Sequence, residues 1–194
     1  LLNPLGLPLA ITEQTRDLYD SLLTLDENDV LLEFVNWSAG SISILQPGCI
    51  AVSYQAIQQG ARLVFLSTNT EGPLMYELMI EELRPVLDEA GYEYGVDYVF
   101  LGYAAGEETA LASIASNIRT LFQADYYGTP IDEIPMMEDI NNYQDYSMVI
   151  TYTMGSPESF VRQFHTQYGV TTHIHCGEMM TPTILPFWAS GQIT

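Results

Sequence analysis

Four residues near the C-terminus form the densest group of side chains that could bind a metal ion or take part in catalysis: His173, His175, Cys176 and Glu178. Residues 173 and 175 of a strand point to the same face, so both imidazoles could reach one metal ion. Glu178, just beyond the predicted strand, could complete the ligand set. A buried strand can equally carry hydrogen-bonded structural histidines. We favour that interpretation, and no metal ion is predicted.

Covalent catalysis has little support in the same segment. His175 and Cys176 are neighbours, and neighbouring strand residues face opposite ways, so the imidazole is poorly placed to activate the thiol. The chain has no G-x-S-x-G motif. Its other cysteine, Cys49, lies far away in the sequence, and both cysteines are predicted to be buried free thiols.

Small polar residues and glycines follow all five predicted strands. In a doubly wound sheet, ligands bind outside the carboxyl ends of the strands. Helix N-caps would also explain many of these hydroxyl side chains, and this alternative stays open. We predict a crevice for a small polar ligand or a protein partner, formed by Ser38, Gly40, Ser67, Asn69, Gly102, Gly106, Glu107, Ser156 and Glu178.

The glycine loop at residues 102–106 does not match a nucleotide-binding motif. Its spacing is not G-x-G-x-x-G, and no Gly-Lys-Ser/Thr follows it. The chain contains no lysine, and Glu107 and Glu108 come directly after the loop, which disfavours bound phosphate. NAD, FAD and ATP are therefore excluded as expected ligands, and no cofactor is predicted.

The elements that must position these residues alternate along the chain. Short apolar runs at residues 29–36, 62–69, 98–101, 147–152 and 171–176 indicate strands. Stretches at 12–25, 47–59, 73–89, 107–122 and 158–168 are typical of helices, and no helix is predicted after Glu178. This alternation predicts a three-layer, doubly wound α/β fold with a mainly parallel five-stranded sheet. It would be flavodoxin-like or Rossmann-like, and the flavodoxin-like strand order is the simplest topology.

The predicted organisation has two parts. Residues 1–28 form an N-terminal arm and first helix, and residues 29–194 form the α/β domain. Residues 124–146 are an irregular excursion, which is long for a loop in a compact domain. Its Met136-Met137 pair could cover the edge of the core or contact a partner, and core cover is the favoured interpretation.

Charge limits the classes of partner. The 194 residues include 25 Asp and Glu but only five basic residues, all arginine, which gives a net charge of -20. Such a charge repels nucleic acids and anionic lipid headgroups, so neither is an expected partner. Acidic surroundings would relieve the self-repulsion, because carboxylates become neutral there. No segment is apolar for long enough to span a membrane, and no signal peptide is visible.

Several segments of the chain resemble an uncharacterised prokaryotic family of membrane-anchored, extracytoplasmic α/β domains. The resemblance rests on residues 3–8, 94–103, 106–107, 125–130, 134–137 and 190–193. It implies a hydrophobic anchor on each side of the domain and a location outside the cytoplasm at the cell membrane. The chain begins without Met and stops abruptly, which agrees with a segment cut from an anchored protein. It departs from the family at residues 36–40 and 173–176, and no catalytic residue is implied.

The leading hypothesis is a non-enzymatic, membrane-tethered extracytoplasmic domain that binds a small polar ligand or a protein partner through its strand-end loops. A second hypothesis is a hydrolase, with or without a metal ion, that uses Glu107, Glu178 or His175 in the same crevice. A third is a structural subunit of a membrane assembly, such as a homo-oligomer, in which residues 124–146 contact a neighbouring copy.

Overall fold

The computed structural model describes residues 11–193, and a five-stranded, entirely parallel sheet forms its centre. The strands are β1 (Val30–Asn36), β2 (Arg62–Ser67), β3 (Tyr98–Tyr103), β4 (Met148–Thr153) and β5 (Thr171–Cys176). The α-helices are α1 (Glu13–Leu22), α2 (Ile42–Gln59), α3 (Gly72–Ala90), α4 (Glu108–Asn117), α5 (Glu158–Phe160) and α6 (Thr181–Ala189). Short helical turns are η1 (Ala39–Ser41), η2 (Ile118–Thr120), η3 (Ile131–Glu133), η4 (Pro135–Met137), η5 (Tyr143–Asp145), η6 (Val161–Thr166) and η7 (Glu178–Met180).

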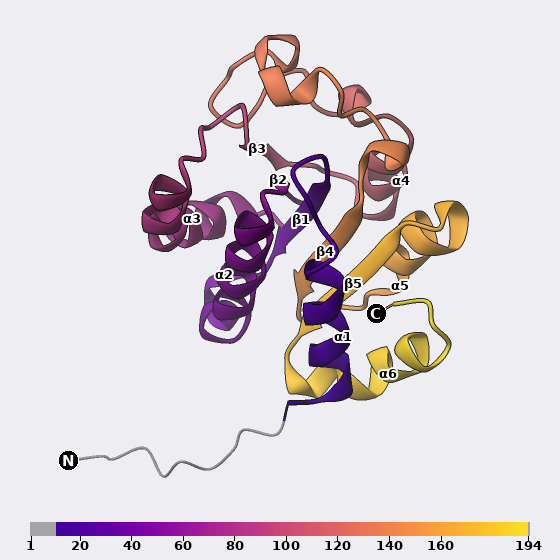
Figure 1. The fold of residues 1–194 in the computed structure, drawn as a ribbon. Helices are drawn as coiled ribbons and strands as arrows, with labels where there is room; N and C mark the ends of the chain where they lie inside the picture. The colour runs from indigo at the N-terminus through magenta and orange to yellow at the C-terminus, as the bar shows by residue number, and fades with distance from the viewer. Residues whose placement is uncertain (1–10, 194) are drawn as a thin grey trace, which may run out of the picture.

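The strand order is β3-β2-β1-β4-β5, which is the order of a Rossmann-like sheet (Figure 1). The predicted three-layer α/β fold is therefore confirmed, but the flavodoxin-like order is not the one adopted. After β3 the chain crosses the sheet and places β4 beside β1. The direction in which strands are added to the sheet therefore reverses at the boundary between β1 and β4. Hydrophobic runs encode the burial of each strand but not its neighbour, which explains why the order could not be predicted.

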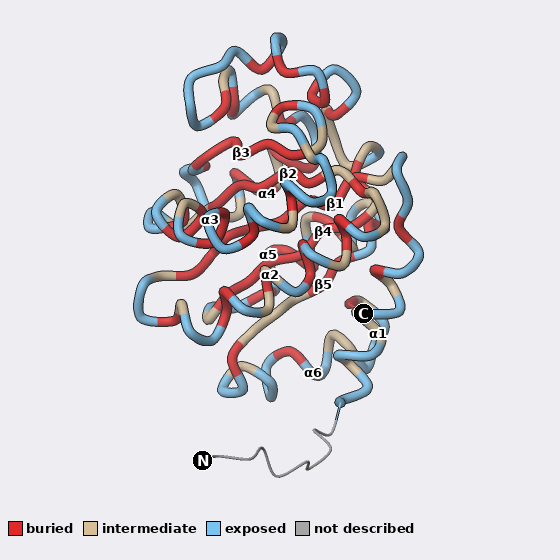
Figure 2. Tube along the Cα trace, turned by 60° about the vertical axis from the view of Figure 1, so that its left-hand side comes forward, coloured by how far each residue is buried: buried red, intermediate tan, exposed pale blue. Residues whose placement is uncertain are grey.

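Side chains from alternate strand positions fill two separate cores, one on each face of the sheet. Residues of α1, α2 and α3 pack on one face. Residues of α4, α5, η6 and the 124–146 excursion pack on the other. Figure 2 shows the buried strands enclosed by helices whose outer faces are exposed. β1 and β4 are fully buried and mostly apolar, because both of their faces are covered.

Helix boundaries differ from the predicted ones where proline is involved. α2 begins at Ile42, five residues before the predicted start, and it contains Pro47. The helix α6 was not predicted, and it contains Pro186. Both prolines are exposed, so each ring lies on the outer side of its helix. Proline usually marks a helix boundary, whereas packing of the apolar sides of these helices stabilises them here.

α1 packs directly on the domain. Leu22 belongs to the core that α2 and α3 build, and Asp17 Oδ2 accepts a hydrogen bond of 2.9 Å from Trp188 Nε1 in α6. Figure 1 accordingly shows α1 and α6 side by side, next to β5. The first ten residues of the predicted N-terminal arm lie outside the described residues.

Candidate functional site

The carboxyl ends of β1, β2 and β4 are tied together by buried polar side chains. Asn36 Oδ1 accepts hydrogen bonds from the Thr68 backbone N–H at 2.8 Å and from Ser67 Oγ at 3.1 Å. Asn36 Nδ2 donates to Thr151 Oγ1 at 3.4 Å. Ser67 is fully buried, so this predicted ligand residue holds strands together instead of facing a crevice.

In the loop that follows β1, a backbone N–H donates a hydrogen bond to an acidic side chain from the loop after β2. The backbone N–H of Ala39, between the predicted site residues Ser38 and Gly40, donates to Glu71 Oε2 at 3.1 Å. Asn69 Oδ1 accepts from the backbone N–H of Glu71 at 2.9 Å and so holds that turn. A carboxylate therefore occupies the place where an anionic ligand would bind the amides of a helix start.

The loop after β3 is a tight turn stabilised from within. Gly102 has φ +92° and lies against Tyr126, whose Cδ2 would be 3.4 Å from a β-carbon added at this position. Gly106 has φ +115°, and its carbonyl accepts a 2.6 Å hydrogen bond from Thr109 Oγ1. Glu107 is exposed and is the one non-glycine residue with positive φ in the part of the chain described. The two glycines thus have backbone and packing roles of their own.

The predicted site residues share one edge of the sheet without forming one cluster. Ser156 is exposed and donates to Glu158 within its own loop. Glu107 follows β3 and Glu178 follows β5, at opposite ends of the strand order. Four inter-strand steps of about 4.8 Å place these loops on the order of 19 Å apart. A single small ligand cannot contact both.

A cavity of about 280 Å³ lies beside β5, between α1 and α6. Residues whose side chains point to either face of β5 line it. The cavity therefore runs along the free edge of the strand and not over one face of the sheet. Most of its surface is apolar, with hydroxyl, imidazole, thiol and carboxyl groups around it. The walls are formed by Thr12, Gln14, Thr15, Leu18, His173, Ile174, His175, Cys176, Glu178, Thr181, Ile184, Leu185, Trp188 and Ile193.

The cavity brings together His173, His175 and Glu178, the three residues considered as metal ligands. They do not form a metal site, because residues 11–193 contain no group of three His, Cys, Asp or Glu side chains placed to hold an ion. His173 is buried, whereas Glu178 is exposed. The two histidines are i and i+2 on β5, as predicted, but the carboxylate does not join them.

His175 lies between β5 and α2. A β-carbon on Gly48 would lie 2.3 Å from His175 Nε2, so only glycine allows the imidazole to pack this closely against the helix. Nε2 is buried without a hydrogen-bond partner, while a hydrogen bond links the ring to the Ile44 backbone. Burial lowers the pKa of His175, so its ring is neutral at neutral pH.

The two cysteines differ in exposure. Cys49 is fully buried in α2, as predicted, whereas Cys176 is partly exposed and lines the cavity. Both are free thiols. Burial raises the pKa of the Cys176 thiol, which favours the neutral, unreactive form. Cys176 is therefore a wall residue and not an activated nucleophile.

A buried carboxyl group in the central strand was missed in the sequence. Glu33 of β1 has no exposed surface, and its oxygens accept hydrogen bonds from Tyr152 Oη at 2.5 Å, Ser53 Oγ at 2.8 Å and Cys49 Sγ at 3.7 Å. Burial raises the pKa of Glu33 to about 7, although the three donors oppose this shift. The signal that could have revealed it is a lone acidic residue inside the apolar run 30–35. Tyr152 also contacts the His175 ring, with the centroids 5.8 Å apart.

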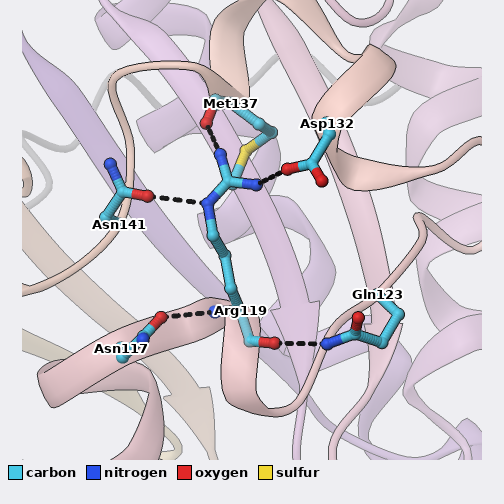
Figure 3. Close-up of polar contacts among 6 residues, drawn as sticks. All are labelled: Asn117, Arg119, Gln123, Asp132, Met137 and Asn141. Carbon is cyan, nitrogen blue, oxygen red and sulfur yellow. Dashed lines mark hydrogen bonds and ion pairs between the residues drawn. The ribbon is translucent and has the colours of Figure 1, made fainter.

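The 124–146 excursion is folded onto the protein by Arg119 (Figure 3). The guanidinium donates to Asn141 Oδ1 at 2.7 Å, to the Met137 carbonyl and to Asp132. Met136 and Met137 are buried in the core, so the interpretation that they cover the edge of the core is confirmed. They do not form an exposed apolar surface for contact with another copy. The segment also covers the edge of the sheet, because the Tyr126 backbone N–H donates to the Phe100 carbonyl of β3 at 3.0 Å.

We expect Arg119→Ala to lower the free energy of unfolding by about 2 kcal/mol, because it leaves the carbonyl of the buried Met137 unpaired and releases Asn141. Urea denaturation measures the change. Asp132→Asn is the control, since the Asp132 side chain is 86% exposed. Its loss should stay below about 1 kcal/mol. Equal losses in the two variants would contradict the central role of the Met137 and Asn141 contacts.

Comparisons of the chain with family models, with curated proteins and with solved structures gave no match. Among the helices described, none combines the length and the apolar character needed to cross a bilayer.

Proposed function

We propose that the protein is a binding domain for a small molecule that occupies the cavity between β5, α1 and α6. The observation that carries the proposal is the cavity itself, which combines a mostly apolar surface with a few polar groups. This combination is typical of small-molecule sites, and the volume is near the lower end of their range. Of the predicted strand-end crevice, only Glu178 belongs to this site.

One helix near the N-terminus and two elements near the C-terminus build the cavity. α1 contributes residues from the N-terminal side, β5 contributes its free edge, and α6 closes the other side. The hydrogen bond between Asp17 and Trp188 links α1 to α6 and holds the two side walls together. The walls are thus set by secondary structure, which preorganises a site for its ligand.

The two alternative functions have less support from the geometry. A hydrolase that combines Glu107 with Glu178 is disfavoured by the opposite positions of β3 and β5 in the sheet. A hydrolase based on His175 is disfavoured because that ring packs against Gly48 of α2. The assembly hypothesis loses its main contact surface because Met136 and Met137 are buried.

A bulky residue in the cavity wall tests the proposal. 1-Naphthalenemethanol, a small neutral aromatic alcohol, should bind the wild-type protein with a Kd of about 1 mM or tighter in a ligand-observed NMR titration. Thr181→Trp should weaken this binding at least about ten-fold, because Thr181 lines the cavity. Thr183→Trp is the matched control, since Thr183 is also exposed on α6 but is not a wall residue.

Two results would overturn the proposal. One is the lack of saturable binding to the wild-type protein. The other is equal weakening by the Thr181 and Thr183 variants, which would place the probe elsewhere on α6. Circular dichroism of both variants checks that the fold is retained.

We further propose that the domain works in acidic surroundings outside the cytoplasm, tethered to the cell membrane. The net charge of -20 and the buried Glu33, whose pKa is raised to about 7, support the acidic setting, because both favour protonated carboxyl groups. The tether is supported by the family resemblance. Protease treatment of intact cells that express the full-length gene product tests the location, and complete protection of this domain would contradict it.

A further inference from the structure

The walls of the cavity have an uneven charge. Among the described residues that line it, the one carboxylate belongs to Glu178, and none is an arginine. Arg84, Arg119 and Arg162 form ion pairs elsewhere, with Glu81, Asp132 and Glu108 respectively. Arg16 lies on α1 but is not one of the wall residues. An anionic ligand would therefore lose its hydration without gaining a guanidinium partner from the described wall residues.

The imidazole of His175 does not supply the missing positive charge at neutral pH. Its pKa is lowered by burial, and the ring is packed against α2. The rest of the protein adds to the same bias, because 25 acidic residues outnumber five arginines. A field of this sign raises the local concentration of cations at the cavity.

Trp188 provides an aromatic wall of the cavity. Its Nε1–H donates to the carboxylate of Asp17 at 2.9 Å. Aromatic faces attract cations, and indole does so more strongly than the other rings. Donation of the N–H to a carboxylate increases electron density on the indole, which strengthens this attraction. Apolar walls from Ile184 and Leu185 stand beside the ring.

From these features we infer that the ligand is an organic cation, an amine attached to a compact apolar body. The apolar part lies against Ile184, Leu185 and Trp188, and the ammonium group lies where the carboxylate of Glu178 can reach it. This inference rests on the proposed small-molecule function and specifies the chemical class of the ligand.

Three probes of nearly equal size test the charge preference. They are 1-naphthylmethylamine, a cation at neutral pH, 1-naphthalenemethanol, which is neutral, and 1-naphthoate, an anion. At low ionic strength the affinity for the cation should be at least about five times that for the alcohol, and the anion should bind most weakly. Added salt should reduce the advantage of the cation, because ions screen exposed charges.

Two carboxylate variants locate the source of the preference. Glu178→Gln should reduce the ratio of cation to alcohol affinity about three-fold, with both affinities measured on the same variant. Glu89→Gln removes the same charge from an exposed position on α3, outside the cavity, and should leave the ratio within error of the wild type. Equal effects of the two variants would assign the preference to the overall charge and overturn the role of Glu178.

The two ways of failing are distinguishable. If none of the three probes binds, the proposed function itself is wrong. A different result is that the alcohol binds the wild-type protein and binds the Thr181→Trp variant more weakly, while the amine binds no more tightly than the alcohol. In that case the site exists and the inferred cationic ligand is wrong.

Discussion

Raising the pH from about 4.5 to 8 should remove about 3 kcal/mol from the stability of this protein through Glu33 alone. The folded-state pKa of Glu33 is raised from 4.5 to about 7. A raised pKa means that the folded state holds the proton more tightly than the unfolded chain does. The stabilising contribution is therefore complete below pH 4.5 and is lost as the pH rises through 7. The difference of about 2.5 pKa units corresponds to about 3 kcal/mol.

Glu33→Gln isolates this contribution from the general repulsion among surface carboxylates. Glutamine stays neutral at every pH, so the stability difference between wild type and variant should change by about 3 kcal/mol between about pH 4.5 and 8, with the variant favoured at the higher pH. Urea denaturation at several pH values measures it. Glu89→Gln is the control for an exposed carboxyl group, and its curve should run parallel to that of the wild type. A parallel curve for Glu33→Gln would refute the buried-acid explanation.

Tyr152 provides a second test of the same cluster. Its hydroxyl donates to Glu33 Oε2, and this hydrogen bond lowers the pKa of the carboxyl group. Tyr152→Phe should therefore move the loss of stability to higher pH, because the carboxylate form is left with fewer donors. The direction of the shift is the informative result, since removal of a buried hydroxyl lowers stability at every pH.

Gly72→Ala should lower the free energy of unfolding by about 3 kcal/mol or more, the second large effect expected. A β-carbon at this buried position would lie 1.9 Å from Ser67 Oγ and 2.7 Å from the Val35 carbonyl oxygen. Ser67 cannot move aside cheaply, because its hydroxyl donates to that carbonyl at 2.7 Å and also contacts Asn36. The methyl group would force α3 away from the ends of β1 and β2.

Gly40→Ala is the matched control for this substitution. Gly40 lies in the neighbouring loop after β1, and the atom nearest to a β-carbon added there would be Ser38 Oγ, at an ordinary 3.8 Å. Its effect should stay within about 0.5 kcal/mol. Chemical denaturation of both variants at one pH gives the comparison. A loss below about 1 kcal/mol in Gly72→Ala would show that the loop network relaxes easily.

The candidate site illustrates how far residue types alone can lead. His173, His175 and Glu178 do line one cavity, and the strand that carries the two histidines was predicted. At the predicted strand-end crevice, Glu71 and Asn36 already accept hydrogen bonds from backbone N–H groups of the loops. These pairings join residues more than 30 positions apart, and no local pattern encodes them. The wall formed by α6 was missed because proline usually breaks a helix.

The sequence by itself determined the class of the fold and the mainly parallel direction of the strands. These properties follow from apolar periodicity, which records locally whether a residue faces solvent or core. Only the tertiary structure decided the strand order, the cavity beside β5 and the partners of Glu33 and Arg119. These depend on which distant segments pack together, because the same apolar strand is equally well buried beside several neighbours. A buried carboxyl group acquires its raised pKa only from the residues that finally surround it.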